Sequence, residues 1–330
     1  MNNASKQDLR KALLAEKKKL EEVDVPVITV SASFRKEIVE KYEVNLRSKG
    51  EIIFSRGHYS EAVSVVEAAR RKGLSSYLVD PMNFVSIKDW GKLEFTEEIG
   101  ELTARYKILA NLKRVAEQLL RGKLPVSEAV KPVVLELIED IKVPIVSGHY
   151  EVGNVIAKTD KKVVQMVTDP HVSDPYLKVA EEGNASWVVF DDGTKKQFVD
   201  KVEKLEKDVD QEMIKVTGPG VNPKILDIGK KGKKLDDDRP LRLGITTGGL
   251  GTNRGEIKKV LDDLAPLIEE PEEVQLFLYS STHKDFRDIF EKFANDNNIR
   301  IGDLDNEKAK LRVLHEDSLV DGNRNLIEYM

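Results

Sequence analysis

Residues 143–190 read VPIVSGHYEVGNVIAKTDKKVVQMVTDPHVSDPYLKVAEEGNASWVVF, and this stretch decides the fold class. It holds three short apolar runs, at 143–148, 162–169 and 185–190, which are separated by longer and more polar segments. Runs of this length that are rich in Val and Ile are typical of strands buried on both faces. The stretch therefore predicts neighbouring strands of a parallel sheet.

The same pattern extends toward both ends of this stretch. Further strands are expected at 26–30, 51–55, 75–80 and 212–218, and amphipathic helices at 60–73 and 194–207. Strands that alternate with helices predict a parallel sheet covered on both faces. Residues 5–22 alternate Lys and Glu around a few leucines, which is typical of a solvated, weakly amphipathic helix.

The second half of the chain repeats the alternation after a break. Residues 229–240 combine Gly, a basic run, an acidic run and a Pro, which indicates a linker. Strands are then expected at 241–249, 274–281 and 311–315, and helices at 254–269, 284–296 and 321–330. We therefore expect two Rossmann-like α/β domains. The expected division is an N-terminal charged helix, a first domain, a linker and a second domain, at 1–22, 23–228, 229–240 and 241–330. Because the final helix should lead into another strand, we expect this second domain to be partial.

The composition excludes several classes of protein. Hydrophobic residues make up 40% of the 330 residues and charged residues 34%, as expected for a globular chain. The net charge of -5 supplies no global basic field for nucleic acid. The absence of Cys excludes disulfides, thiol nucleophiles and thiolate metal sites, and residues 1–22 lack the apolar core of a signal peptide. For these reasons we expect a cytoplasmic location. No apolar run approaches the roughly 18 residues of a membrane span, so any membrane contact should be peripheral.

Three loops could carry chemistry, and the first is FSRGHYSEAV at 54–63. Here we expect a strand to pass through Gly57 and His58 into a helix that has Ser60 as its N-cap. A helix N-terminus preceded by Gly suits a phosphate or a sugar hydroxyl, and a His placed there can act as a general base. The alternative is a tight turn with an exposed His.

The second loop region follows two neighbouring strands. His149 follows the run at 143–148, while Thr168, Asp169 and His171 follow the run at 162–169. Ligands of open α/β sheets bind at the carboxyl ends of the strands, so these side chains should lie on one edge with His58. A metal site is the weaker interpretation, because Asp169 and His171 are only two ligands, separated by a Pro.

The third loop is ITTGGLGTNRGE at 245–256. Gly248, Gly249 and Gly251 would let backbone N–H groups approach a phosphate at the start of the following helix. The spacing is not GxGxxG, and no P-loop Lys is present, so neither a Rossmann dehydrogenase nor a P-loop NTPase is indicated. The alternative is a flexible loop.

In their order along the chain, these motifs resemble those of the GT-B glycosyltransferases that act on membrane lipids. This group includes the monogalactosyl- and diglucosyl-diacylglycerol synthases and the N-acetylglucosaminyltransferase that forms lipid II. The resemblance covers about residues 50–315, and its strength is the ordered set. The matching features are Gly57-His58 with Ala62, VTDPHVSDPYL (167–177), WVVF (187–190) followed by TGPGVNPKI (217–225), and the GGxG loop at 248–251.

The resemblance implies transfer of a sugar from a nucleotide diphosphate, a UDP-sugar, to a hydroxyl acceptor. It implies an inverting reaction without metal or cofactor, with His58 as the base and Asp169 orienting it. The residues implied on the acceptor side are Gly57, His149, Thr168 and His171. The residues implied on the donor side are Thr247, Gly248, Gly249, Gly251, Ser280 and Ser281.

Two other functions remain open on the sequence. A sugar-nucleotide binding or scaffold protein without turnover could keep the same two domains, and a sugar-nucleotide epimerase on the same shell ranks last because no carboxylate-rich cleft is evident. Residues 105–123 carry six basic residues beside several leucines, which favours either a helix lying on an anionic membrane face or a buried helix with a charged outer side. The resemblance adds a membrane lipid as acceptor, which would make the protein peripheral at the inner membrane face.

Overall fold

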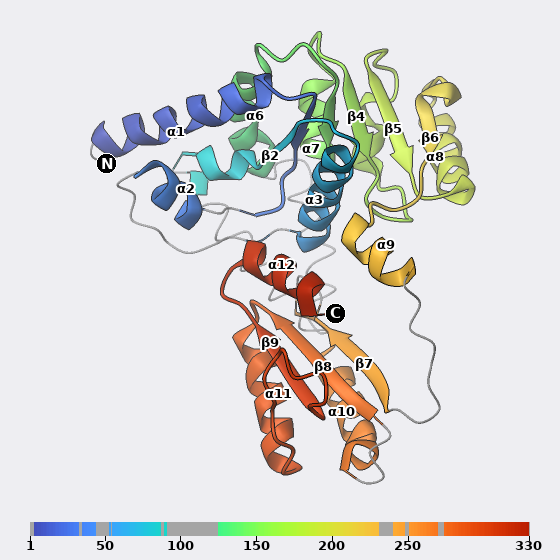
Figure 1. Cartoon of the computed structure of the whole chain (residues 1–330). Coiled ribbons are helices and arrows are strands. Elements are labelled where there is room, and N and C mark those ends of the chain that lie inside the picture. Colours follow the sequence, from blue (N-terminus) through green and yellow to red (C-terminus); the bar gives the residue numbers. More distant parts are fainter. Residues whose placement is uncertain are drawn as a thin grey trace. The chain divides into compact units, whose positions relative to one another are not determined.

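Two parallel sheets, one in each half of the chain, organise the fold (Figure 1). The structure is a computed structural model that describes residues 3–32, 35–43, 53, 55–86, 89–90, 125–230, 240–247, 251–269 and 274–329. The described residues up to Pro223 belong to one unit, and those from Lys224 onward belong to another. We call them unit 1 and unit 2.

Unit 1 contains a six-stranded sheet in the order β2-β1-β3-β4-β5-β6, and every neighbouring pair is parallel. Its strands are β1 (Val25–Ile28), β2 (Ser76–Val79), β3 (Ile145–Ser147), β4 (Val163–Met166), β5 (Ala185–Val189) and β6 (Ile214–Val216). β1 begins one residue before the run predicted at 26–30, and each of the other five lies within a predicted run. The expected α/β class with parallel sheets is therefore confirmed.

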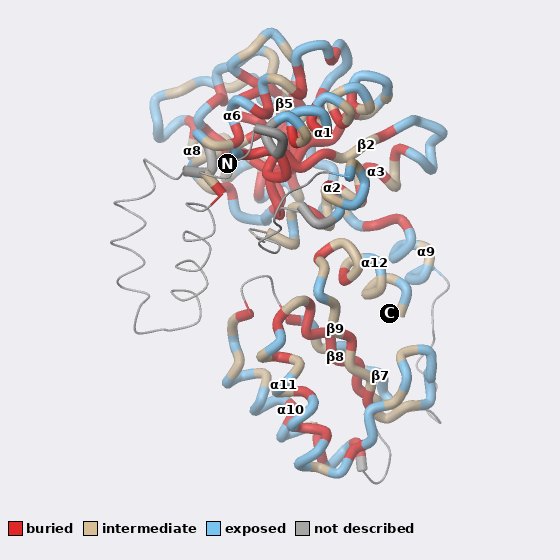
Figure 2. Tube along the Cα trace, turned by 90° about the vertical axis from the view of Figure 1, so that its left-hand side faces the viewer, coloured by how far each residue is buried: buried red, intermediate tan, exposed pale blue. Residues whose placement is uncertain are grey.

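Most of the core of unit 1 lies on one face of this sheet, which we call the closed face. It is formed with α1 (Asn3–Glu21), α2 (Arg35–Tyr42), α6 (Pro125–Ile138), α7 (Tyr150–Ile156) and α8 (Asp192–Lys204). Side chains of these helices pack on strand residues such as Ile28, Val163 and Trp187. In Figure 2 the buried residues, in red, gather in the interior of this unit, around β5. The closed face supplies most of the hydrophobic stabilisation of unit 1.

The opposite face, which we call the open face, carries a smaller core. Ala62 and Val66 of α3 (Arg56–Arg71) pack there on Val27. Within the described part of unit 1, α3 is the helix that packs on this face, and it lies over β1 and β2. Because side chains alternate along a strand, Val164 and Val188 also point to this face, and both remain only half-buried. The sequence predicts helices on both faces of the sheet, and the described helices cover the closed face much more completely than the open face.

Helix α1 belongs to the core of unit 1, which differs from the expectation of a separate solvated helix. Leu9, Leu13 and Leu20 are buried in the closed-face core. Glu16 is buried as well, and its carboxylate accepts hydrogen bonds from Tyr42, Tyr77 and Lys41. The alternating charges of this segment are therefore the outer side of an amphipathic helix whose inner side is apolar.

The strand expected at 51–55 is wrong for the residues that the structure describes there. Ile53 forms one isolated antiparallel bridge with Ala32, and the backbone N–H of Ser55 donates to the carbonyl of Ser31. Ile53 and Ser55 thus bond to the loop that follows β1 and are not part of the parallel sheet. The apolar run at 51–55 is short, and a run of this length does not distinguish a sheet strand from a buried loop.

Unit 2 forms its own parallel sheet, as the sequence predicts. The strands β7 (Leu241–Thr246), β8 (Val274–Ser281) and β9 (Leu311–His315) pair in that order. Helices α10 (Arg254–Glu269) and α11 (Lys284–Asp296) pack on Leu276 and Leu278, while α12 (Leu319–Tyr329) packs on Phe277 and Tyr279 of the opposite face. Residues 241–330 therefore do not complete the sheet of unit 1.

The region between the two sheets differs in part from the expected linker. Helix α9 (Pro223–Lys230) occupies its start, so the division between the units falls at residue 223 rather than 228. Residues 231–239 lie outside the described residues, and so does the basic segment at 105–123. None of the described helices has the length and apolar character needed to cross a bilayer.

Candidate functional site

The strand order of unit 1 places a topological switch point between β1 and β3. The chain passes from β1 to β2 on one side, and the next strand, β3, lies on the other side of β1. At such a point the loops that leave the two strands diverge, and the crevice at their carboxyl ends is where open α/β sheets bind ligands. The loops concerned follow β1 at Thr29 and β3 at Gly148.

A buried carboxyl anchors the loop that follows β1. Asp80, at the carboxyl end of β2, accepts hydrogen bonds from the backbone N–H groups of Ser31, Ala32 and Met82 and from the Ser31 hydroxyl, at 2.8–3.0 Å. Burial raises the pKa of Asp80 to about 6, although these hydrogen bonds oppose the shift. The anchor fixes the path of the backbone beside the switch point.

Helix α3 begins earlier than the sequence predicts. Its N-cap is Ser55, whose hydroxyl accepts from the backbone N–H of His58 at 3.3 Å, and its first residue is Arg56. The prediction of Ser60 as N-cap is therefore wrong, and Gly57 and His58 lie in the first helical turn. Ser55 is an equally good cap, and Gly is tolerated in a first turn, so the helix starts at the earlier signal.

His58 and His149 meet at the switch point. Their ring centroids are 4.7 Å apart in an edge-to-face arrangement. Both ring nitrogens of His58 are buried and have no hydrogen-bond partner among the residues that the structure describes. Burial lowers the pKa of His58 to about 4, and the charge of Asp169 opposes this shift. His58 is therefore neutral at pH 7, with a nitrogen lone pair that a ligand can use.

His149 is held in one orientation by the start of α7. It is the N-cap of that helix, and its Nδ1 accepts from the backbone N–H of Glu151 at 3.2 Å. The bond requires the proton of the neutral ring to be on Nε2. Burial, together with His58, lowers the pKa of His149 well below its usual value. The two rings thus meet as neutral imidazoles.

A row of aromatic rings continues from His149 to the end of β4. His149 lies 4.2 Å from Tyr150, and Tyr150 lies 5.4 Å from Tyr176, measured between ring centroids. The Tyr176 hydroxyl is 3.1 Å from Oγ1 of Thr168. Thr168 is thus buried and already bonded within unit 1, and burial raises the pKa of Tyr176 to about 12.

Asp169 lies exposed at the rim of this group, and its charge acts on His58, on Glu61 and on Tyr176. It therefore lies close to His58, as expected, although no hydrogen bond joins the two side chains. His171 lies on an exposed turn two residues later. The structure thus brings His58, His149, Thr168 and Asp169 to one edge, while Gly57 and His171 face solvent.

The sequence reasoning missed two polar residues of this site. Thr29 is fully buried under Gly148, where a Cβ would lie 2.8 Å from its Oγ1, and that hydroxyl has no partner among the described residues. Glu61 lies three residues after His58 on α3, a spacing that places both on one side of a helix. The spacing could therefore have predicted that Glu61 lies beside His58, whereas nothing in the sequence indicates that Thr29 belongs to the site.

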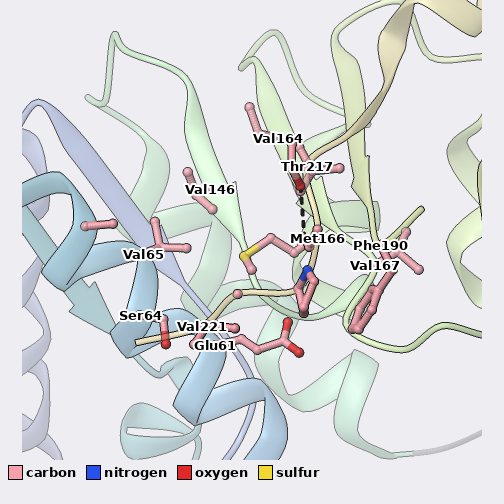
Figure 3. A pocket seen from close by; sticks show the side chains of 15 residues that line it. Glu61, Ser64, Val65, Val146, Val164, Met166, Val167, Phe190, Thr217 and Val221 are labelled. Carbon is pink, nitrogen blue, oxygen red and sulfur yellow. Dashed lines mark hydrogen bonds between the residues drawn. The ribbon is translucent and has the colours of Figure 1, made fainter. Parts of the chain in front are cut away.

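Beside the switch point, a pocket of about 350 Å³ opens on the open face of the sheet (Figure 3). One wall is α3, another is formed by side chains of β3, β4 and β5, and the loop at 217–221 forms the third. Most of the lining is apolar. It consists of Glu61, Ser64, Val65, Ala68, Val146, Val164, Met166, Val167, Val188, Phe190, Thr217, Gly218, Pro219, Gly220 and Val221.

In unit 2, the structure describes some of the predicted donor-side residues and not others. Gly248 and Gly249 lie outside the described residues, while Gly251 has a left-handed φ of 58° just before α10. Thr247 follows β7, and its buried Oγ1 has no partner among the residues described.

Ser280 and Ser281 end β8 and are fully buried. Oγ of Ser280 donates to the Leu314 carbonyl and lies 2.9 Å from Nδ1 of His315, and Oγ of Ser281 donates to the Tyr279 hydroxyl. Both hydroxyls are thus engaged inside unit 2, and their donor-side role stays a prediction. Over the described stretches of the chain, no three His, Asp or Glu side chains gather as a metal-binding group.

Comparisons with known proteins give distant structural similarity but no match by sequence. No family model matches the chain, and neither does any curated protein. Among solved structures, the chain is similar to a UDP-GlcNAc 2-epimerase from Neisseria meningitidis bound to UDP-GlcNAc, with 11% identity and a TM-score of 0.41. The match covers 90% of this chain and 73% of that one. The resemblance to the lipid-modifying glycosyltransferases therefore stays a prediction.

Proposed function

We propose that this protein transfers a sugar from a nucleotide diphosphate to a hydroxyl acceptor, with His58 as the general base. The observation that carries the proposal is the setting of His58. It lies at the β1/β3 switch point, it is neutral, and both of its ring nitrogens lack partners among the described residues. A hydroxyl that binds there can donate its proton to the ring as its oxygen attacks the sugar.

Asp169 would assist by its charge. An imidazole with a pKa of about 4 is a weak base, and the proton it receives becomes more favourable when a carboxylate lies nearby. Asp169 is that carboxylate, because its charge opposes the lowering of the His58 pKa. In the edge-to-face contact, His149 would hold the His58 ring in place.

Unit 2 would bind the nucleotide diphosphate. Thr247 follows a strand, and its hydroxyl lacks a partner within the described part of the chain, while Gly251 precedes the 16-residue helix α10. A helix N-terminus reached through a Gly-rich loop favours phosphate. By the resemblance, the donor is a UDP-sugar and the acceptor a membrane lipid reached by peripheral contact, and the reaction is metal-independent and inverting.

The test measures UDP release from UDP-galactose, UDP-glucose and UDP-N-acetylglucosamine, with and without diacylglycerol vesicles. His58→Ala should lower turnover roughly a hundredfold, the usual scale for a lost general base, while the affinity for UDP is retained. Glu67→Gln, on the same helix but outside the site, is the matched control. Wild-type turnover should rise as the pH increases through about 4 and then stay level.

The same experiment distinguishes sugar transfer from a second function, the binding of a sugar nucleotide without turnover. UDP should raise the melting temperature of the wild type, because it binds the folded state, and Thr247→Val should reduce that rise. If UDP binds but no donor gives turnover with any acceptor, a sugar-nucleotide binding protein is favoured, because the unpartnered hydroxyl of Thr247 would still serve binding. Equal turnover of the wild type and His58→Ala would remove His58 from the mechanism.

A further inference from the structure

The pocket on the open face exists because α3 and the loop at 217–221 present little bulk to it. Ser64 and Ala68 are one turn apart on α3, and both line the pocket. The loop adds Gly218, Pro219 and Gly220, and a Cβ on Gly220 would lie 3.3 Å from Cβ of Glu61. Small side chains on two walls thus leave a space that the valines of the sheet do not fill.

The sheet wall of the pocket is apolar. Val146, Val164 and Val188 come from three adjacent strands, and Met166 and Phe190 extend this wall toward the carboxyl edge. Among the described residues, no Lys, Arg or His lines the pocket. An anion would therefore lose its hydration there without meeting a cation, which strongly disfavours its binding.

Glu61 is the single ionisable side chain that the described residues contribute to the lining. Figure 3 shows it reaching from α3 into the pocket. No hydrogen bond joins its carboxyl group to any residue that the structure describes. Burial raises the pKa of Glu61 to about 8, and the nearby charge of Asp169 acts in the same direction. At pH 7 the group is therefore mostly a neutral acid, which can donate one hydrogen bond.

We propose that this pocket binds an uncharged, mainly apolar small molecule through a carbonyl or ether oxygen, which accepts a hydrogen bond from the Glu61 carboxyl group. A volume of about 350 Å³ is within the range of small-molecule sites, which are commonly apolar with a few placed polar groups. The ligand oxygen would supply the partner that Glu61 lacks in the described structure. This binding goes beyond the proposed sugar transfer, because it requires neither His58 nor unit 2, although Glu61 lies beside His58 on α3.

Two titratable groups lie near Glu61, one on its own helix and one on the loop after β4. His58, three residues earlier on α3, is neutral at pH 7, and Asp169, from the loop after β4, carries the charge that acts on Glu61. As the pH rises through about 8, Glu61 loses its proton and can no longer donate to a ligand oxygen. The binding of such a ligand should therefore weaken with rising pH.

The experiment uses the full chain and 6-propionyl-2-(dimethylamino)naphthalene, an uncharged naphthalene that carries one ketone. Its emission shifts to shorter wavelength in an apolar site. We expect saturable binding at pH 7, and we expect Ala68→Phe, which fills the pocket from α3, to weaken it at least tenfold. Val63→Phe, on the same helix but outside the lining, is the matched control. Unchanged binding by Ala68→Phe would place the dye elsewhere and overturn the proposal.

A second arm tests the hydrogen bond. Wild-type affinity should fall roughly tenfold or more between pH 7 and pH 9.5, because only the protonated fraction of Glu61 is competent to bind. Glu61→Gln stays neutral and keeps a donor, so its affinity should not change over this range, whereas Glu67→Gln should behave like the wild type. The anionic dye 8-anilinonaphthalene-1-sulfonate should bind much more weakly at pH 7. A wild-type affinity that is independent of pH, or tight binding of the anion in the pocket, would overturn the assignment to Glu61.

Discussion

Trp187 and Val188 are consecutive residues of β5, and they show how different the two faces of the first sheet are. Trp187 points to the closed face and is 1% exposed, whereas Val188 points to the open face and is only half-buried. Val163 and Val164 of β4 differ in the same way. The closed face thus holds the unit together, while the open face beside α3 keeps apolar surface available to a ligand.

The largest test of this comparison replaces one residue on each face. Trp187→Ala should lower the free energy of unfolding by about 3–5 kcal/mol, the usual loss for a fully buried aromatic side chain. Val188→Ala should lower it by about 1 kcal/mol or less, because less area leaves contact. Urea denaturation of the full chain, followed by circular dichroism, measures both. Equal losses would mean that the open face is as well packed as the closed one.

Two Gly→Ala substitutions, one on each face, sharpen the comparison, because each adds one methyl group. On the closed-face helix α7, a Cβ at Gly153 would overlap the side chain of Gln165, whose Nε2 donates to the carbonyls of Ser147 and Met166. We expect Gly153→Ala to cost about 2 kcal/mol, through overpacking and loss of these bonds. Gly220→Ala faces the pocket, where its nearest contacts are 3.3–3.4 Å, and should cost under about 0.5 kcal/mol. The melting temperatures of the two variants should differ accordingly, and the reverse order would contradict the contrast.

The smallest expected effect is a pH dependence that comes from the open face. The pKa of Glu61 is about 8 in the folded chain, above its usual 4.5, so the folded state binds more protons between these values. Stability should therefore fall as the pH rises from 4.5 to 8. Glu61→Gln should remove this contribution and be more stable than the wild type at pH 9, by under about 1 kcal/mol because solvent screens the partly exposed group. Thermal melts at pH 5, 7 and 9 measure this pH dependence, with Glu67→Gln as the control. If stability changed with pH equally in the wild type and in Glu61→Gln, the prediction would be wrong.

Much of the fold could be predicted because buried parallel strands have a distinctive pattern. The runs around Val146, Val164 and Val188 are apolar on both faces of the strands, so they mark a sheet whether or not a helix covers each face. For the same reason, they could not reveal that the open face is partly uncovered. The run at 51–55 has similar residues, yet Ile53 and Ser55 bond to the loop after β1, and these are tertiary contacts that the local sequence does not specify.

The candidate site could be predicted in outline but not in its chemistry. The rule that ligands bind at the carboxyl edge brought His58, His149 and Asp169 together, because it depends only on strand order and direction. The neutral state of both histidines comes from burial, which depends on packing by distant segments. The same rule placed Ser280 and Ser281 at a ligand site, but their hydroxyls form hydrogen bonds inside unit 2. A hydroxyl at the end of a strand can bond within its own unit as readily as to a ligand.

Asp80 has a consequence for how this edge of the molecule can change by mutation. Three of its four hydrogen-bond donors are backbone N–H groups, at residues 31, 32 and 82. Substitutions of Ala32 or Met82, other than by Pro, retain those donors, whereas Asp80→Ala removes the acceptor of all four bonds at once. The geometry of the loop beside the switch point therefore depends on one codon for its hydrogen-bond acceptor, whereas the buried side chains of Ala32 and Met82 are constrained separately, by packing.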